Sequence, residues 1–348
     1  MSIRRSGETG SSADQTGSSV SEAGTPVGEA ESSGQTGLWG GPTAVLAVVT
    51  VQVAAFTVAS ATGRPTWYVP FALVSAGVLG ARNDDGWFGV VIAGLAATLL
   101  LALGVPILAF LLRQQPGLVW EAATDGAVHR MLFVTVYAPL LAALGSLAGG
   151  VPLAYLLARG FPGERVVESL VDLPLVVPHS VAGILVLFGF GRGGVFPNVE
   201  ILSSLTGMVL ALAFVGAPFA VHGAREGFEA VDDDLRMAAR SQGASPFETF
   251  RRVTLPLAGR SVVTGGVLAW ARGVSEFGAV AVVAYTVSVV VPGVGAITAS
   301  HAPVFVYQTY TSRGLAESGA VAAVLLAVSA AVFLLVRWVT DDGTPGVA

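Results

Sequence analysis

Two charged residues, Arg272 and Glu276, stand four residues apart within the long apolar stretch 259–284. Residues at this spacing share one face of a helix, so the two charges are expected to meet. Charged side chains inside a membrane span are costly and usually functional. Arginine before glutamate is also the weaker order for stabilising a helix. The pair therefore either holds helices or subunits together, or Arg272 lines or gates a path for an anion while Glu276 offsets its charge.

A hydroxyl-bearing residue, Ser180, follows two prolines in the apolar stretch 170–190. Pro174 and Pro178 are expected in the first turns of a span, where proline costs little. The hydroxyl of Ser180 at that end can donate to an oxyanion in a pore or form a structural hydrogen bond. Three histidines are expected at span ends, where interfacial packing is usual: His129, His222 and His301.

The composition is that of a chain that crosses a membrane many times. Of 348 residues, 53% are hydrophobic and only 12% are charged, whereas soluble domains average about 25% charged residues. There is no cysteine, which excludes disulfides, thiolate metal sites and cysteine nucleophiles. All 18 basic residues are arginine. Without lysine the chain has neither a Walker A phosphate loop nor a Schiff-base lysine.

Hydropathy predicts an all-α fold, a polytopic transmembrane helical bundle of about eight spans. The predicted spans are 42–62, 66–82, 88–112, 131–157, 170–190, 201–223, 259–284 and 316–338. An even number places both termini on one side. Most arginines then fall on that side, whereas the opposite loops carry one each, so the positive-inside rule makes both termini cytoplasmic.

The first 37 residues, 1–37, are rich in Gly, Ser and Glu and nearly free of apolar side chains. Such a segment cannot bury enough surface to offset the entropy lost on ordering, so a disordered tail is predicted. No apolar core follows Arg4 and Arg5 directly, which excludes a signal peptide at this end.

A polar loop, 224–258, separates the sixth and seventh predicted spans, and its residues specify two short helices. The acidic run Asp232–Asp234 can cap a helix through "LRMAARSQ", and Gly243 can end it in the left-handed conformation. Ser245 and Glu248 then have the spacing of a capping box, with proline in its favoured place between them. Pro256 is expected to end this element.

The loop is either a plain connector or a docking element for a soluble partner. Phe247 and Phe250 lie beside a tight turn, and exposed aromatic side chains in such a place suit insertion into a groove of another protein. Arg251 and Arg252 are expected to face water or lipid headgroups.

The stretch "AARSQGASPFETFRRVTLPL" resembles the cytoplasmic loop signature of ABC importer permeases. That signature reads E-A-A, three residues, G, nine residues, I, one residue, L-P. The matching positions are Ala238, Ala239, Gly243, Val253, Leu255 and Pro256. Met237 stands where the signature has its leading Glu. The resemblance implies that this loop, with Ser245, Phe247 and Glu248, is the coupling helix that seats in a cleft of a separate ATPase.

Two further segments, 151–187 and 271–285, resemble the permeases for tetrahedral oxyanions, namely molybdate, tungstate and sulfate. They contain "LPLVVPHSVAG" and "ARGVSEFGA". The stretch "HAPVFVYQTYTSRGL" is similar to the molybdate/tungstate branch. The similarity covers roughly 88–338. It implies a six-span core at 86–340, preceded by an extra two-span hairpin at 38–85.

The resemblance implies the non-catalytic membrane subunit of an ATP-driven importer that moves molybdate or tungstate by alternating access. It implies a homodimer in membrane lipid, a dimeric ABC ATPase that carries the ATP and Mg, and an extracytoplasmic oxyanion-binding protein. No cofactor or metal is expected on this chain. A net charge of −5 gives no support for nucleic-acid binding. The alternatives are a sulfate/thiosulfate permease of the same architecture or an ion-coupled secondary transporter, for which only Glu276 and Asp172 are near candidates.

Overall fold

The computed structural model describes residues 42–81, 86–191, 194–195, 200–291 and 295–341. The chain divides into two compact units, Met1–Leu101 and Ala102–Ala348. The predicted tail at 1–37 lies outside the described residues. Both units are built almost wholly of helices within the described ranges, in agreement with the predicted all-α class.

The first unit contains α1 (Pro42–Ala61), a short 3-10 turn (Pro65–Trp67), α2 (Tyr68–Ala81) and most of α3 (Gly86–Leu112). The rings of Phe56 and Tyr68 meet edge to face with centroids 5.2 Å apart. The amide of Gln52 also donates to the hydroxyl of Ser75 over 2.7 Å. These contacts join α1 to α2 in an antiparallel pair of helices.

The second unit contains the end of α3 and all later elements. Its helices and strands are α4 (Pro116–Thr124), α5 (Gly126–Leu157), α6 (Glu164–Val176), α7 (His179–Phe190), α8 (Leu205–Glu229), α9 (Asp233–Ser241), α10 (Pro246–Thr249), a π-helical turn (Phe250–Thr254), α11 (Leu255–Val274), α12 (Gly278–Val283), β1 (Val287–Val291), β2 (Gly295–Ala299), α13 (Ala302–Arg313) and α14 (Leu315–Asp341).

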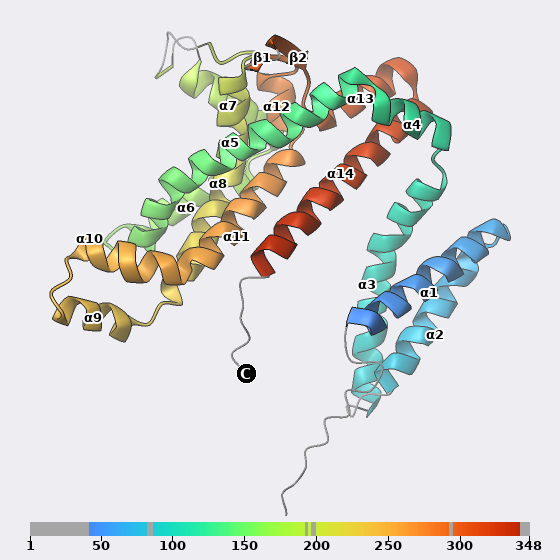
Figure 1. Cartoon of the computed structure of the whole chain (residues 1–348), viewed down its shortest axis with the longest axis horizontal. Coiled ribbons are helices and arrows are strands. Elements are labelled where there is room, and N and C mark those ends of the chain that lie inside the picture. The colour runs from blue at the N-terminus through green and yellow to red at the C-terminus, as the bar shows by residue number, and fades with distance from the viewer. Residues whose placement is uncertain (1–41, 82–85, 192–193, 196–199, 292–294, 342–348) are drawn as a thin grey trace, which may run out of the picture. The chain divides into compact units, whose positions relative to one another are not determined.

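The core of the second unit is the packing of α8 between α5 and α11, and it runs the length of the bundle (Figure 1). Small residues allow these helices to approach closely. A Cβ atom placed on Gly223 would lie 2.6 Å from the Cα of Gly265, so the helix backbones touch here. Interfaces of this kind are typical of helices that pack in a membrane, where apolar burial gives little driving force.

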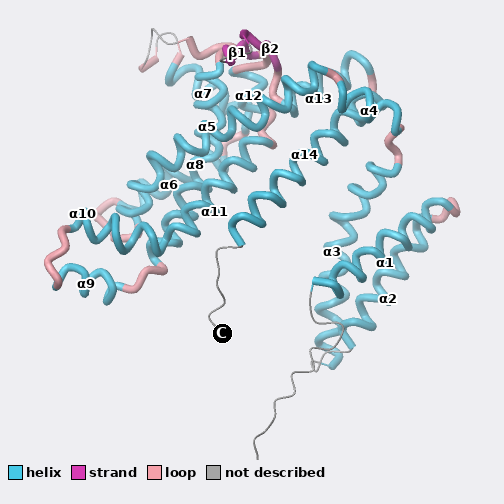
Figure 2. The backbone as a smooth tube through the Cα atoms, viewed as in Figure 1, coloured by secondary structure: helices cyan, strands magenta, loops and turns pink. Residues whose placement is uncertain are grey.

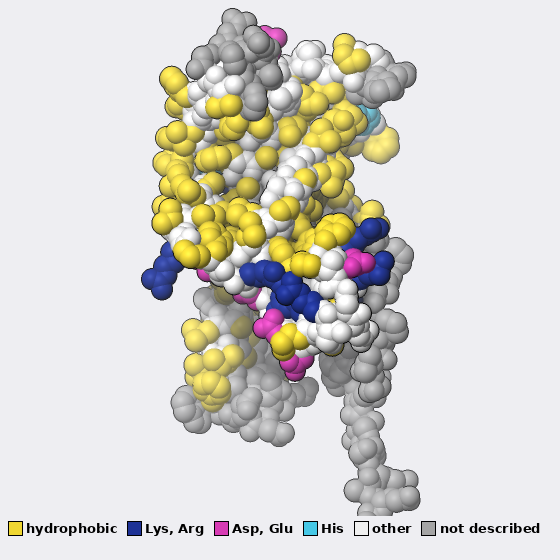
Figure 3. Space-filling model, turned by 90° about the vertical axis from the view of Figure 1, so that its left-hand side faces the viewer, with side chains coloured by type: hydrophobic (Ala, Val, Ile, Leu, Met, Phe, Trp, Pro, Cys, Tyr) yellow, Lys and Arg dark blue, Asp and Glu magenta, His cyan; other side chains and the backbone are white. Residues whose placement is uncertain are grey.

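The two ends of this bundle differ in character (Figure 2). At one end β1 and β2 form an antiparallel hairpin in which Val287 pairs with Ala299. The opposite end carries α9 and α10. Figure 3 shows a hydrophobic flank with the arginine side chains gathered below it, at the α9–α10 end. The arrangement suits a membrane-embedded bundle with a polar, arginine-rich rim.

Four helices in the described part of the chain are long and apolar enough to cross a membrane: Val91–Leu112, Gly126–Leu157, Leu205–Glu229 and Leu315–Leu335. The chain is thus a multi-span helical protein, but the structure does not establish eight continuous spans. Two of the predicted spans, 170–190 and 259–284, are wrong as single helices.

The predicted span 170–190 divides into α6 and α7. Val177 and Pro178 are extended, with ψ angles of 130° and 133°. The ring of Pro178 disfavours helical geometry at the preceding residue, which accounts for the break. Pro174 lies near the end of α6, and Pro178 occupies the position just before α7. The prediction that both prolines lie in the first turns of a span is therefore wrong.

The predicted span 259–284 divides into α11 and α12, with a break at Ser275–Phe277. The backbone N–H of Ala279 donates to the carboxylate of Glu276 over 2.9 Å. The side chain therefore satisfies an N–H at the start of α12, as a capping residue does, and a new helix begins there.

The predicted stop at Pro256 is also wrong. The π-helical turn joins α10 directly to α11, so helical backbone continues from Pro246 to Val274. Pro256 lies at the first turn of α11. Proline has no backbone N–H to donate. After the wider π turn this position needs no such donor, so the helix is not interrupted.

Candidate functional site

A polar cavity of about 710 Å³ opens at the two helix breaks. It brings together the three residues that the sequence nominated for an anion path, Arg272, Glu276 and Ser180. The other lining residues are Pro174, Leu175, His179, Val215, Ser275, Phe277 and Gly278. Both breaks therefore serve to place polar side chains and free backbone around one space.

The guanidinium of Arg272 is held between Glu276 and His179, and its Nη1 also lies 3.5 Å from Oγ of Ser275. Its Nη2 lies 2.8 Å from Oε2 of Glu276 and 2.9 Å from Nε2 of His179. The ring of His179 is also 3.8 Å from the Glu276 carboxylate. An arginine has five N–H donors, and this fork leaves several of them for a further acceptor. The cavity thus contains a fixed positive group that is only partly engaged.

Glu276 is one of the most deeply buried charged residues, with 1% of its surface exposed. One oxygen accepts the N–H of Ala279 and the other faces Arg272. The expectation that both residues share one helix face is wrong, because α11 ends at Val274 and Glu276 lies in the break. The carboxylate therefore offsets the arginine charge and fixes the start of α12 at the same time.

Close packing of α7 on α12 shapes one wall of the cavity. A Cβ atom on Gly278 would lie 2.8 Å from the Cβ of His179, and one on Gly183 would lie 2.7 Å from the carbonyl oxygen of Ala279. Larger residues at these two positions would push the helices apart. The glycines therefore keep His179 within reach of Arg272.

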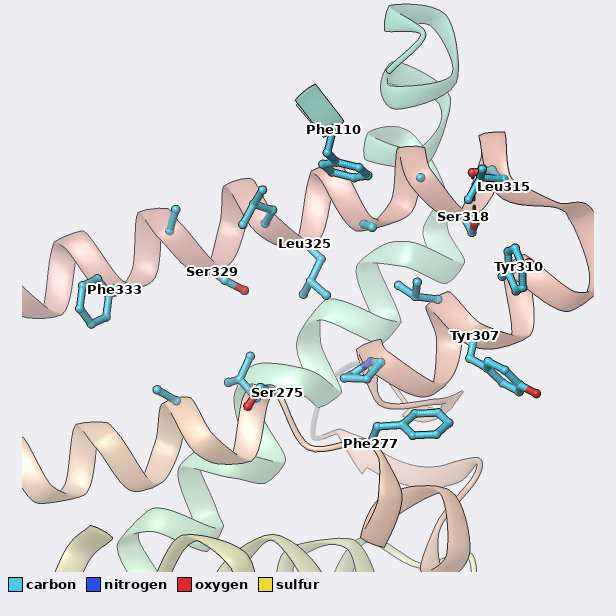
Figure 4. A pocket seen from close by; sticks show the side chains of 18 of the residues that line it. Phe110, Ser275, Phe277, Tyr307, Tyr310, Leu315, Ser318, Leu325, Ser329 and Phe333 are labelled. Carbon is cyan, nitrogen blue, oxygen red and sulfur yellow. Dashed lines mark hydrogen bonds between the residues drawn. The ribbon is translucent and has the colours of Figure 1, made fainter. Parts of the chain in front are cut away.

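A larger cavity of about 1070 Å³ lies on the other side of the same break (Figure 4). Ser275 and Phe277 line both spaces. Its wall comes from α11, α13, α14 and the end of α3, with Tyr307, Tyr310 and Phe333 among the lining residues. None of the described residues that line it is charged, whereas the smaller cavity holds the Arg272 guanidinium and is therefore the better site for an anion.

A second polar cavity, of about 420 Å³, lies between α8 and α11 nearer the α9–α10 end. It is lined by Leu175, Pro218, Phe219, His222, Gly223, Glu226, Arg260, Ser261, Thr264, Gly265 and Leu268. Nε2 of His222 is 2.6 Å from Oδ1 of Asp172. His222 was expected at a span end, but it lies inside α8 and pairs with α6. This pairing also gives Asp172 a partner.

An ion cluster fastens α6 to α8. Arg225 contacts Glu229 at 2.6 Å, Glu168 at 2.8 Å and Glu164 at 2.9 Å. Each of the three guanidinium nitrogens donates to a different carboxylate, and such charge-assisted hydrogen bonds are strong. The cluster therefore fixes the position of α6, the helix that contains Pro174 and ends at the first break.

The predicted helices of the polar loop are confirmed by the structure. Asp232 accepts the N–H of Asp234 at the start of α9. Gly243 has φ +91°, the left-handed conformation expected of it. Ser245 and Glu248 form both hydrogen bonds of the capping box, and the Ser245 N–H bond holds the pKa of Glu248 below its usual value.

The surface of this loop is apolar as well as charged. The side chain of Phe247 is 66% exposed and that of Met237 is 59% exposed. Arg251 and Arg252 are exposed, as expected. Ala238 and Ala239 lie in α9, Val253 in the π turn, and Leu255 and Pro256 in the first turn of α11. The loop presents a compact, exposed surface on two linked helices.

His301 was expected at an interface, but it is fully buried at the start of α13. Neither ring nitrogen has a hydrogen-bond partner of standard geometry among the described residues. Burial lowers its pKa to about 4, and the nearby backbone of Glu276 offsets part of that shift. A neutral histidine thus lies beside the break that carries the ion pair.

Two residues that line these cavities, His179 and Arg260, were not predicted from the sequence. His179 follows Pro178 directly, so its position at a helix start was a usable signal. Arg260 lies twelve residues before Arg272, which is about 120° around α11, so the spacing alone gave no reason to group the two arginines. No group of three or more His, Asp or Glu suited to a metal occurs within the described ranges.

Comparison with known proteins decides the family. Residues 150–341 match the model of the binding-protein-dependent transport system inner membrane component. The molybdate/tungstate transport system permease protein WtpB of Pyrococcus abyssi is 36% identical over 260 residues, which cover 71% of this chain and 93% of that protein. The chain belongs to this permease family.

Two other relatives widen the comparison. The probable molybdenum ABC transporter permease protein HVO_B0370 of Haloferax volcanii is 38% identical, over 73% of this permease and 90% of the relative. The probable sulfate transport system permease protein cysT of Nephroselmis olivacea is 31% identical, over 69% and 86%. The permease is a non-catalytic, multi-pass membrane component, and its family implies a separate ATPase and a substrate-binding protein.

Proposed function

We propose that this permease forms the pathway of an ATP-driven importer for a tetrahedral oxyanion, molybdate or tungstate. The observation that carries the proposal is the cavity at the helix breaks, where Arg272 is held beside Ser180 and His179 with donor capacity left over. A fixed guanidinium lowers the energy of a dianion in a space of low dielectric constant. One relative is named for molybdate and tungstate and another for molybdenum, and both names support this choice of ion.

The second candidate is sulfate, because a sulfate permease protein also matches most of the chain. All three ions are tetrahedral dianions, and one guanidinium with hydroxyl donors suits each of them. In this proposal the cavity holds the ion weakly, and the separate binding protein selects it. Weak binding is needed because a tightly held ion would not leave the pore.

The exposed loop at α9–α10 is the proposed contact with the ATPase, and this end of the bundle therefore faces the cytoplasm. Phe247 presents an exposed aromatic ring on two capped helices, and such a side chain can insert into a cleft of a partner protein. Two copies of the permease, one per ATPase subunit, would place two such loops side by side. ATP and Mg belong to the ATPase, and its closure would switch the pathway from inward-open to outward-open.

The proposed division of the chain follows the sequence prediction, with a disordered tail at 1–37, an extra hairpin at 38–85 and a permease core at 86–340. Both termini are proposed to be cytoplasmic, because the arginines of the tail and the α9–α10 loop then share one side.

Uptake by the purified transporter tests the function. The permease is reconstituted in vesicles with its ATPase inside and its binding protein outside, and labelled molybdate, tungstate and sulfate are offered in turn. We expect ATP-dependent uptake of molybdate or tungstate, with sulfate entering more slowly. Vesicles that lack ATP are the control. Faster uptake of sulfate would favour the second candidate, and absence of uptake for all three would overturn the proposal.

A further inference from the structure

The cavity at Arg272 has a counterpart towards the α9–α10 end. The 420 Å³ cavity also lies against α8 and α11, and Leu175 lines both spaces. The two cavities are therefore neighbours, and a single leucine side chain borders each of them.

A ridge on α11 winds from one cavity to the other, turning about 40° at each step of four residues. Its members are four residues apart: Arg260, Thr264, Leu268 and Arg272. The first three line the second cavity and the fourth lines the first. At 1.5 Å per residue the two arginines are separated by about 18 Å along the helix. The ridge thus carries a cation near each end, with an apolar step at Leu268 between them.

Arg260 has the properties of an anion ligand. It forms no ion pair in the part of the chain that the structure describes, although Glu226 lines the same cavity. The hydroxyl of Ser261 lines the space beside it, whereas the hydroxyl of Thr264 donates to the backbone carbonyl of Arg260 over 3.0 Å. A charged guanidinium and a neutral hydroxyl donor form a set that binds oxyanions with charge-assisted hydrogen bonds.

We propose that the second cavity is a further oxyanion station, in which Arg260 and Ser261 receive the ion after it leaves Arg272. The station deepens the proposed function and rests on it. Two weak sites in series allow an ion to cross an apolar step without being trapped at either. Glu226 keeps the station weak, because its negative charge repels the dianion.

The absence of cysteine from the chain provides a direct test. The substitution Leu268→Cys places a single thiol in the cavity, at a side chain that is 47% exposed and is not one of the proposed ligands. Its reaction with a small anionic methanethiosulfonate is followed in the full permease assembled with its ATPase, with and without tungstate. Tungstate at twice its dissociation constant should slow labelling about threefold.

Substitutions at the proposed ligands make the test specific. Arg260→Gln should abolish the protection by tungstate, and Arg260→Lys should retain part of it. Ser261→Ala should reduce protection without altering charge. Glu226→Gln should increase it. Leu257→Cys is the matched control, since that leucine is 56% exposed on the same helix and outside the cavity. Tungstate should leave its labelling rate unchanged.

Two results would overturn the station: labelling of Leu268→Cys that tungstate does not slow, or equal protection when Arg260 is Gln. Normal labelling at Leu257→Cys in the Arg260→Gln chain shows that the variant is folded. Uptake and protection are separate measurements. Tungstate import without protection would retain the proposed function and reject the station. Protection without import of any oxyanion would retain the binding site and reject the proposed function.

Discussion

Arg272 and Glu276 meet across the end of a helix, with 2.8 Å between Nη2 and Oε2. The arginine belongs to the last turn of α11, and the glutamate lies in the break that follows. The pair therefore joins an element of the bundle to the loop that starts α12. Its two members have different environments, since Glu276 is almost fully buried whereas the Arg272 side chain is 21% exposed and borders a cavity.

The first prediction separates the two members of this pair. Arg272→Gln should reduce oxyanion uptake by about tenfold, equivalent to about 1.4 kcal/mol, while the ATPase still binds. Glu276→Gln should retain the acceptor for the Ala279 N–H but leave an uncompensated cation, and so impair folding or gating. Uptake in reconstituted vesicles at matched protein amounts is the measurement. A double variant that transports like the native chain would reject the anion-path role.

The second prediction concerns Gly243, whose φ of +91° favours glycine. A side chain there would meet no atom within 4 Å, so the cost of substitution is one of backbone conformation alone. Left-handed geometry costs an ordinary L-residue about 1–2 kcal/mol. Gly243→Val should insert in the membrane normally but lose co-purification of the ATPase and transport. Gly243→Asn, which tolerates this conformation better, is the control and should retain most of both.

The third prediction concerns the clamp at Arg225. Arg225→Gln would leave Glu164, Glu168 and Glu229 close together without their cation. We expect a loss of roughly 1–3 kcal/mol in stability, seen as a lower melting temperature in detergent. Arg251→Gln is the matched control, because Arg251 is exposed and forms no ion pair within the described ranges. Equal melting temperatures for the two variants would contradict a structural role for the cluster.

The fourth prediction is a pH dependence at His301. Its pKa is about 4 in the fold, against about 6.5 in an unfolded chain. The unfolded state therefore binds the extra proton first, so stability is complete above pH 6.5 and falls as the pH drops towards 4. The expected loss is about 3 kcal/mol, since each pKa unit is 1.36 kcal/mol. His301→Asn should have a shallower decline in melting temperature across this range, and an unchanged decline would reject the assignment.

The fifth prediction concerns the N-terminal segment. Deleting residues 1–84 removes α1 and α2 and leaves α3 and the whole second unit. Uptake of labelled oxyanion should survive, at lower expression. Loss of uptake at normal protein levels would show that the hairpin takes part in transport.

The polar loop was predictable because its signals are local. Asp232, Gly243 and the Ser245–Glu248 box each act through hydrogen bonds or torsion angles within a few residues, and all behave as expected. Hydropathy also located the long helices of the bundle, since a membrane span needs only length and apolar composition.

The broken spans were not predictable in the same way. Hydropathy at 170–190 and 259–284 is continuous, and nothing in it records that the backbone turns. The break at Ser275–Phe277 depends on Glu276 capping α12, and the reach of His179 to Arg272 crosses 93 positions of sequence. Pro178 indicated a break in the first of these spans, but proline is also tolerated near span ends. Tertiary contacts decide between those outcomes.

The unbroken helical path from Pro246 to Val274 has a mechanical consequence. Its regular part, α11, is about 30 Å long at 1.5 Å per residue, with Arg272 near one tip, and the π turn joins the other tip to the proposed ATPase contact. A tilt of α11 by about 8° about that other tip would move the Arg272 tip by about 4 Å, more than the length of the Arg272–Glu276 ion pair. A small torque applied to the α9–α10 loop is thereby amplified at the Arg272 tip, because no loop separates the two.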